Sequence, residues 1–575
     1  MQFIKAFYYT ISVALLMFSV GCKSDTKTSI DIINVRINEG PDGLFPLTSK
    51  TAVAGQISSK VYLPLADFNP ETLVLEPVLL EEIPEPRIDT LGETYDMRIL
   101  KDAIWSDGKP VTANDVLFTL KLIANPYSEF GSIESTVKNI VSLSSADPAG
   151  KSFKIVFNGK YHLDLEAFTN LPILPAHIFD SKNSMSNYDY SSLVEHGDSL
   201  KTTADSTIFK TIAENALVQN KDFKNIIGCG AYSISEWMPG QRLTLIKNKN
   251  YWGDKEGKKR IELQAFPKTI NYLILPEEST AMAALKAGQI DILSDVPEES
   301  VDQIKNDPNL ASHYEIATPD VLQYLYIGMN NNGIILQDVN VRKALAQLVN
   351  VDQLIQSLMG GEATKVFSPI LSQKPYAVNN LKPVVYNPEM SAAILDQNGY
   401  SKKGKDGIRQ FVKDGKTYRM SFSLLTTGKQ LGKDIAGLFS EEARKIGIEI
   451  KLEVMDFPKI LERIKSGNYD MANLAVKQFP GLDDPYLAWN SANAFGKGSN
   501  YCNFSNPLVD RITESIRTVK SNKERTTLYQ NFQRAIISHY PVIFLFTPKN
   551  RIIVRKDLNP VFSVKRPGYF ENTMH

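Results

Sequence analysis

Two stretches of the sequence decide the fold, IWSDGKPVTANDVLF at residues 104–118 and IIGCGAYSISEWMPGQRLTLIKNKNYW at residues 226–252. Each joins turns set by glycine or proline to segments of alternating apolar residues, and each ends in a large aromatic residue. Such alternation predicts half-buried β-strands. Thr112 followed three residues later by Asp115 predicts a capped helix start. We therefore expect the Asp115 carboxylate to serve structure rather than catalysis.

The first 22 residues predict export. Lys5 precedes an apolar run at residues 6–20, which is too short to span about 30 Å of hydrocarbon as a helix but suits a signal peptide. The run ends in Ser19-Val20-Gly21-Cys22, which resembles the lipobox of bacterial lipoproteins, although Ser19 stands where leucine is usual. Cys22 would then carry the lipid, and residues 23–29 would form a solvated tether. The alternative is an ordinary secretory signal with a stray cysteine.

Length and charge limit the architecture and the partners. A chain of 575 residues with 43% hydrophobic and 22% charged residues is too long for one hydrophobic core. Lysine plus arginine and aspartate plus glutamate each total 64, so no net field recruits nucleic acid or anionic lipid. After Cys22 only Cys229 and Cys502 remain, and their distant positions leave a single bridge undecided. We expect two or more lobes and free thiols.

In the C-terminal half, predicted strands alternate with predicted helices. Strand-like alternation at residues 418–425, 448–454 and 469–476 is separated by helical stripes at residues 435–446 and 460–464. This order predicts βαβ crossovers and a parallel sheet.

The two opening stretches resemble the family 5 extracellular solute-binding proteins of bacterial ABC importers. The resemblance covers nearly the whole mature chain, because shorter matches follow in the order of the family. These are GLFPL at 43–47, LPAHI at 174–178, AMAALKAGQIDI at 281–292, DVNVRKAL at 338–345, NGY at 398–400 and NPLVD at 506–510. In this pattern Trp105 and Trp252 would be core anchors.

The resemblance implies an α/β type II periplasmic-binding-protein fold, with two lobes joined by a two-strand hinge and a subdomain inserted in the first lobe. The main lobe would take residues 23–60, 225–318 and 543–575, the inserted subdomain residues 61–224, and the second lobe residues 319–542. Strands near residues 318–326 and 541–546 would cross between the lobes. A double crossing makes a hinge that closes over a ligand.

The function that follows is that of a substrate-binding lipoprotein of an ABC importer. It would capture oligopeptides or dipeptides between the lobes on the periplasmic side of a bacterial membrane and deliver them to permease and ATPase subunits. We expect a monomer that uses no cofactor, metal or nucleic acid. Alternative cargoes of the same fold are a metal chelate, haem, glutathione or an oligosaccharide, and a third class is a surface receptor that does not transport.

Two segments are candidates for the ligand site. Lys50, Thr51 and Ala52 lie where peptide-binding relatives offer backbone and a pocket-lining side chain. The loop KQFPGLDDPYLAW at residues 477–489 follows a strand of the predicted sheet, and ligands bind at the carboxyl ends of such strands. The candidates in and after this loop are Lys477, Phe479, Gly481, Asp483, Asp484, Trp489, Asn500 and Tyr501.

The loop departs from the peptide-binding pattern at one position. In the peptide binders an aspartate four residues before the loop proline pairs with the free α-ammonium group of the ligand, whereas here Gly481 stands four residues before Pro485. Asp483 would take over that role, and Asp484 would occupy the structural acidic position of the family. The alternatives are that both carboxylates cap a turn or helix ahead of Pro485, or that the ligand has no free amino terminus.

An enzyme is the least favoured class. Gly415-Lys416-Thr417 resembles part of a phosphate-binding loop, but Gln410 stands where that motif needs glycine, and KDGKTYR at residues 413–419 reads as a hairpin turn. The sequence has neither an HExxH nor a GxSxG motif, and its six histidines have no metal-ligand spacing. No catalytic residue is therefore predicted.

Overall fold

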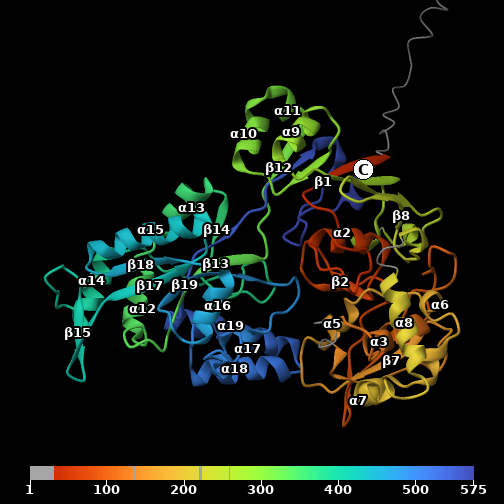
Figure 1. Ribbon diagram of the computed structural model, residues 1–575, viewed down its shortest axis with the longest axis horizontal. Coiled ribbons are helices and arrows are strands. Elements are labelled where there is room, and N and C mark those ends of the chain that lie inside the picture. The colour runs from red at the N-terminus through yellow and green to blue at the C-terminus, as the bar shows by residue number, and fades with distance from the viewer. Residues whose placement is uncertain (1–30, 131–132, 134–136, 219–222, 258) are drawn as a thin grey trace, which may run out of the picture.

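The computed structural model describes residues 31–130, 133, 137–218, 223–257 and 259–575. The predicted signal peptide and Cys22 lie outside this part of the chain. Figure 1 shows two lobes side by side, joined by extended segments at the top of the view, with the inserted subdomain below the main lobe. No described helix is long and apolar enough to cross a membrane.

The main lobe is built on a seven-stranded sheet in the order β12-β22-β11-β1-β10-β9-β8. β1 runs parallel to β10 and β11, and the other pairs are antiparallel. The strands are β1 (Ile32–Ile37), β8 (Tyr232–Met238), β9 (Arg242–Lys247), β10 (Thr269–Ile274), β11 (Ile292–Ser294), β12 (Tyr314–Ala317) and β22 (Ile552–Arg555). The stretch 226–252 thus supplies the hairpin β8–β9, as its alternation predicts. Gly240 makes the turn with φ +75°.

The helices of this lobe are α2 (Ala52–Val61), α9 (Glu278–Lys286), α10 (Glu298–Asn306) and α11 (Pro308–His313). Thr51 caps α2, because its side chain accepts a hydrogen bond from the Ala54 amide.

The inserted subdomain has a four-stranded antiparallel sheet in the order β4-β5-β7-β6 and a short pair β2-β3. Its strands are β2 (Ala66–Phe68), β3 (Leu75–Pro77), β4 (Arg87–Asp89), β5 (Gly92–Arg98), β6 (Ile140–Ser144) and β7 (Ser152–Phe157). Its helices are α3 (Ala113–Ile123), α5 (Asp164–Thr169), α6 (Ala176–Phe179), α7 (Tyr190–Leu200) and α8 (Ser206–Val218).

The stretch 104–118 folds partly as expected. The capping box of Thr112 and Asp115 is present at the start of α3 and confirms the predicted helix. The predicted strand is wrong, because the chain before α3 makes only an isolated bridge around a tight turn at Gly108. Trp105 and Trp252 are buried, 1% and 6% exposed. The turn is closed by the Gly108 amide, which donates to the Trp105 carbonyl at 2.9 Å.

The second lobe has a five-stranded sheet in the order β18-β17-β19-β13-β20. Its strands are β13 (Gln323–Met329), β17 (Ser421–Thr426), β18 (Glu449–Val454), β19 (Met471–Lys477) and β20 (Val542–Phe544). β17 is parallel to β18 and β19, which confirms the predicted crossovers. β13 is antiparallel to both β19 and β20, so the sheet is mixed rather than parallel throughout.

Helices cover both faces of this sheet. They are α12 (Val339–Ala346), α13 (Val351–Met359), α14 (Pro388–Gln397), α15 (Gln430–Lys445), α16 (Phe457–Lys465), α17 (Pro485–Trp489), α18 (Pro507–Thr518) and α19 (Asn522–His539). A hairpin of β15 (Gln410–Lys413) and β16 (Lys416–Arg419) projects from the far end of the lobe (Figure 1). The strand expected at 418–425 is therefore two strands, because Tyr418 belongs to the hairpin and β17 begins at Ser421.

The chain crosses between the lobes twice. Residues 318–322 lead from β12 to β13, and residues 549–551 lead from β21 (Phe546–Pro548) back to β22. The second crossing lies later than expected, because β20 pairs with β13 and β21 pairs with β14 (Ala363–Lys365). The crossings touch, since the Asn550 amide donates to the Pro319 carbonyl at 2.8 Å. The exact lobe boundaries stay a prediction.

Cys229 and Cys502 are both buried and free. Cys229 belongs to the core of the main lobe and inserted subdomain, and Cys502 to a core of the second lobe. The expectation of free thiols is therefore confirmed.

Candidate functional site

A cavity of about 500 Å³ lies in the main lobe at the ends of β1 and β11. Its walls are α2 and the C-terminal segment 563–572, and it reaches the two interlobe crossings at Asp320, Val321 and Asn550. Carboxyl ends of neighbouring strands are where open α/β sheets bind ligands. The cavity therefore combines the sheet edge expected of a ligand site with direct contact to the hinge.

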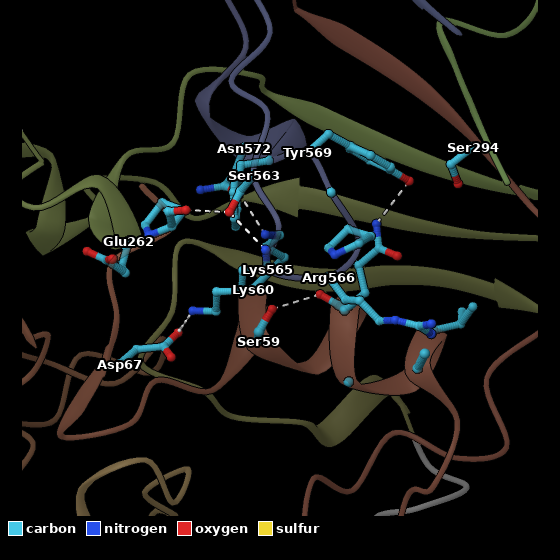
Figure 2. A pocket seen from close by; sticks show the side chains of 18 of the residues that line it. Ser59, Lys60, Asp67, Glu262, Ser294, Ser563, Lys565, Arg566, Tyr569 and Asn572 are labelled. Carbon is cyan, nitrogen blue, oxygen red and sulfur yellow. Dashed lines mark hydrogen bonds and ion pairs between the residues drawn. The ribbon is translucent and has the colours of Figure 1, made fainter. Parts of the chain in front are cut away.

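Helix α2 presents a polar face to this cavity. Ala52, Gln56, Ser59 and Lys60 line it, and their spacing places them on one side of a helix. Ala54 and Val61, on the opposite side, are buried. Figure 2 shows Ser59 and Lys60 rising from this helix below the C-terminal segment.

The cavity wall carries charges of both signs. The Lys60 ammonium donates to the Asn572 side chain at 2.7 Å, and burial lowers the pKa of Lys60. Lys565 forms an ion pair with Asp67 at 2.7 Å. Arg566 lines the cavity and is exposed. Cationic and anionic groups of a ligand could thus both find partners here.

Glu262 is the least satisfied group in the wall. Both of its carboxylate oxygens are shielded from solvent and have no hydrogen-bond partner among the described residues. Burial, and after it the nearby Asp67 carboxylate, raises the pKa of Glu262 to about 7. In Figure 2 Glu262 and Tyr569 lie on opposite sides of the cavity. A carboxylate in this state gains a hydrogen bond from any ligand that brings a donor.

On the second lobe, the loop after β19 is organised around a buried lysine. The Lys374 ammonium donates to the carbonyls of Phe479 and Gly481 and lies 3.4 Å from the Asp483 carboxylate. The Tyr376 hydroxyl donates to the same carboxylate at 2.7 Å. Burial raises the pKa of Asp483 and lowers that of Lys374. Because Asp483 already has two partners, a ligand ammonium would have to share it with them.

The loop also meets the inserted subdomain. The Leu482 amide donates to the Glu166 carboxylate at 3.1 Å. The His162 Nε2 atom lies 3.2 Å from the Asp483 carbonyl and 3.1 Å from the Tyr529 hydroxyl. These contacts close the side of the molecule opposite the hinge.

Further contacts bind the same two surfaces together. Lys520 of the second lobe forms an ion pair with Glu93 at 2.8 Å and donates to the Gly159 carbonyl. The Arg517 guanidinium lies 4.9 Å from the centre of the Tyr161 ring. The lobes are therefore in contact both at the hinge and at the opposite rim.

The predicted site residues do not all lie in one site. Ala52 lines the cavity, whereas Thr51 caps α2 and the Lys50 amide donates to Asp42. In the loop after β19, Lys477 is exposed and Phe479 is 78% exposed.

Other predicted residues serve the second lobe itself. Asp484 caps α17 and pairs with Arg517 at 3.2 Å. Trp489 and Asn500 are buried, and the Tyr501 carbonyl accepts a hydrogen bond from the Tyr469 hydroxyl. Ligand contacts by these residues stay predictions, and this placement adds no support for them.

The sequence pattern does not predict the charged residues of the cavity wall. Lys60 and Asp67 come from one stretch of the sequence and Glu262 and Lys565 from two others far along the chain, and none of the four belongs to a motif. The one available signal was the polar stripe of α2, which contrasts with its buried apolar side. Among the described residues, no group of three or more histidine, cysteine or acidic side chains could hold a metal ion.

Two α/β lobes, two crossing segments and a cavity at the strand ends define a type II periplasmic binding protein. Residues 74–498 match the model described as bacterial extracellular solute-binding proteins, family 5 middle, and the chain belongs to this family. It is 26% identical over 479 residues to the oligopeptide-binding protein AppA of Bacillus subtilis, an alignment that covers 81% of this chain and 78% of that protein.

Other relatives have different names. The nickel-binding periplasmic protein of Escherichia coli is 24% identical over 340 residues, which is 56% of this chain and 60% of that protein. The solved structure of NikA from Brucella suis in complex with Fe(III)-EDTA superposes with a TM-score of 0.72 at 18% identity, covering 95% of this chain and 99% of that one. The first is named for binding nickel, and the second was solved with a bound metal chelate.

Proposed function

We propose that this chain captures peptides between its lobes and delivers them, chemically unaltered, to the permease of an ABC importer. It would work as a monomer held at the outer side of a bacterial membrane by a lipid on Cys22. The observation that carries the proposal is the cavity at the strand ends, which touches both interlobe crossings. A ligand placed there can sense whether the lobes are open or closed.

Closure gives the mechanism. A ligand shifts the balance between open and closed forms only by its differential affinity for the closed form. The main lobe offers the charged cavity wall, and the second lobe offers the loop after β19 with the exposed Phe479 ring. A peptide held between them would use strand edges for its main chain and the cavity for a side chain. Neither surface alone encloses it.

Peptide cargo is supported by the relatives. The solved structure of AppA from Bacillus subtilis contains a nonapeptide and superposes with a TM-score of 0.62 at 23% identity, covering 95% of this chain and 99% of that one. A second candidate is an anionic metal chelate, because the relatives named above include a nickel-binding protein and a complex with Fe(III)-EDTA. Lys60, Lys565 and Arg566 in the cavity wall favour it.

Native mass spectrometry of the purified chain tests the cargo. A co-purified peptide is the expected result, and a metal chelate or sugar would replace the peptide proposal. Calorimetry with free and acetylated peptides then asks whether Asp483 binds the amino terminus. If it does, acetylation weakens binding in the wild type but not in Asp483→Asn. Equal affinities in both proteins would remove that role from Asp483 and leave peptide binding intact.

Labelled palmitate tests the anchor. Incorporation into the wild type and not into Cys22→Ser is expected, and incorporation into both would contradict a lipid on Cys22.

A further inference from the structure

The hairpin β15–β16 has no part in the proposed capture of cargo. It projects from the end of the second lobe that lies farthest from the main lobe (Figure 1). We call residues 402–419, which include the hairpin and the turn before it, the basic hairpin. Its side chains at Lys402, Lys403, Lys405, Lys413 and Lys416 are all exposed.

The basic hairpin concentrates charge in a chain that is neutral overall. It holds seven lysine or arginine residues and two aspartates, an excess of five positive charges. Arg409 pairs with Asp396, and Arg419 pairs with Asp406. Among the described residues, the five lysines have no ion-pair partner. Their charge is therefore available to a partner from outside.

The register of the strands places like charges opposite each other. Lys413 is directly across from Lys416 at the turn, and Lys403 is bridged to Arg409. Like charges in such positions destabilise a strand pair. Val412, next to this turn, is 58% exposed. A hairpin selected for its own stability would not combine these features.

We propose that the basic hairpin binds the anionic headgroups of a phospholipid bilayer. A bilayer presents many negative charges in a plane, which matches several lysines on one projecting element. Lysines near an anionic surface each add to binding, and the effect is screened by salt. The exposed Val412 side chain suits the boundary between headgroups and acyl chains. This contact would be remote from β1 and would help to set the orientation of the lobes at the membrane.

Vesicle flotation tests the proposal. Every sample is the chain from residue 23 onward, so that neither the predicted signal peptide nor a lipid on Cys22 contributes. Vesicles contain either phosphatidylcholine alone or phosphatidylcholine with about 30% phosphatidylglycerol. The test variant replaces the five lysines 402, 403, 405, 413 and 416 with glutamine. The matched control replaces five exposed lysines elsewhere, at 101, 154, 182, 249 and 305, and so changes the net charge equally.

The hairpin variant should bind anionic vesicles at least about tenfold more weakly than the wild type. The control should change by less than about twofold, and the wild-type preference should vanish at roughly 0.5 M salt. Equal losses in both variants, or no preference of the wild type for phosphatidylglycerol, would overturn the proposal. Displacement of the wild type from vesicles by single-stranded RNA of equal phosphate concentration would also overturn it, in favour of nucleic acid.

Thermal unfolding checks that each variant is folded. If the glutamine variant is not, the pair Lys413→Gln and Lys416→Gln alone should still weaken binding about threefold. Replacement of all five lysines with arginine should preserve binding, because it keeps the charge. Loss of binding in the arginine variant would contradict recognition by charge.

Discussion

Glu262 is a carboxylic acid that the folded protein holds in a buried position, which disfavours its ionised form. Its pKa is raised to about 7 from a usual 4.5, chiefly by burial. Because the folded state binds this proton more tightly than the unfolded state, the proton's contribution to stability is fully present below about pH 4.5. That contribution is lost as the pH rises through 7. Glu262→Gln should therefore raise the free energy of unfolding by about 1–3 kcal/mol at pH 8 and by much less at pH 5.

Urea denaturation at both pH values measures this difference. The same variant should weaken cargo binding if Glu262 receives a ligand donor. A stability gain of equal size at pH 5 and pH 8 would show that the charge is not its cause.

Lys374 and Asp483 should behave as one unit. Lys374→Met leaves the Asp483 carboxylate buried without its cation, so about 3–5 kcal/mol of stability should be lost at neutral pH. Adding Asp483→Asn to this variant should restore part of that loss. A double-mutant cycle from chemical denaturation provides the measurement. Losses that simply add would contradict the buried pair.

The sequence singled out Asp483 but not its partner. Asp483 lies after a predicted strand and two residues before Pro485, which are local signals. Lys374 comes from a segment far away in the chain, and nothing in its neighbours marks it as buried. The same reason hid Glu262 and Lys565, because a cavity wall is assembled by tertiary packing and not by spacing along one element.

At the scale of elements, Asp115 links three segments. Its carboxylate accepts hydrogen bonds from the Thr112 amide at 2.7 Å, the Ala176 amide at 2.8 Å and the Trp105 indole at 3.3 Å. Asp115→Ala should therefore cost about 2–4 kcal/mol of stability, because it leaves buried donors unpaired. Equilibrium denaturation measures the loss. Cargo affinity of the folded variant should stay within about twofold, and a selective loss of affinity would contradict a purely structural role.

Helices and strands could be predicted where the spacing of apolar residues agreed with the glycine, proline or capping residues at the ends of the segment. The helical stripe at residues 435–446 and the strands around it correspond to α15 and its neighbours β17 and β18, because one face of each element is buried. The strand predicted before α3 is a tight turn in the structure, since alternation over so few residues fits a strand and a tight turn equally well. In the loop after β19, the alternative that an aspartate caps a helix at Pro485 is confirmed for Asp484, which is the cap of α17.

At the scale of the molecule, Gly481 sets how closely the lobes approach. A Cβ atom there would lie 2.4 Å from the Glu166 carboxylate and 2.4 Å from the Phe68 ring, both on the inserted subdomain. Gly481→Ala should keep the loop after β19 away from the inserted subdomain and so prevent full closure. The radius of gyration of the cargo-loaded protein in X-ray scattering should then increase, and cargo binding should weaken about tenfold or more.

Gly428 provides the control for this variant. A Cβ on Gly428 would meet no atom within 4 Å, so Gly428→Ala should leave both measurements unchanged. Identical scattering from Gly481→Ala and the wild type would contradict the closure described here.

Closure should also couple to protons through two groups at the rim whose effects oppose each other. Burial raises the pKa of Glu166 to about 7 and lowers that of His162 to about 3. Glu166 faces Lys374, Asp483 and Arg525, and separation of the lobes would return both groups to water and to their usual pKa values of 4.5 and 6.5.

The signs follow from linkage. Between pH 4.5 and 6.5 closure takes up a proton at Glu166 and releases one at His162, so cargo affinity of the wild type should change little. Glu166→Gln leaves only His162, and affinity should then rise with pH over this range by up to about tenfold per pH unit. His162→Gln leaves only Glu166, and affinity should fall with rising pH. Calorimetric titrations of cargo at pH 5, 6 and 7 measure these changes in affinity. If affinity depends on pH in the same way in both variants, Glu166 and His162 are not the source of the coupling.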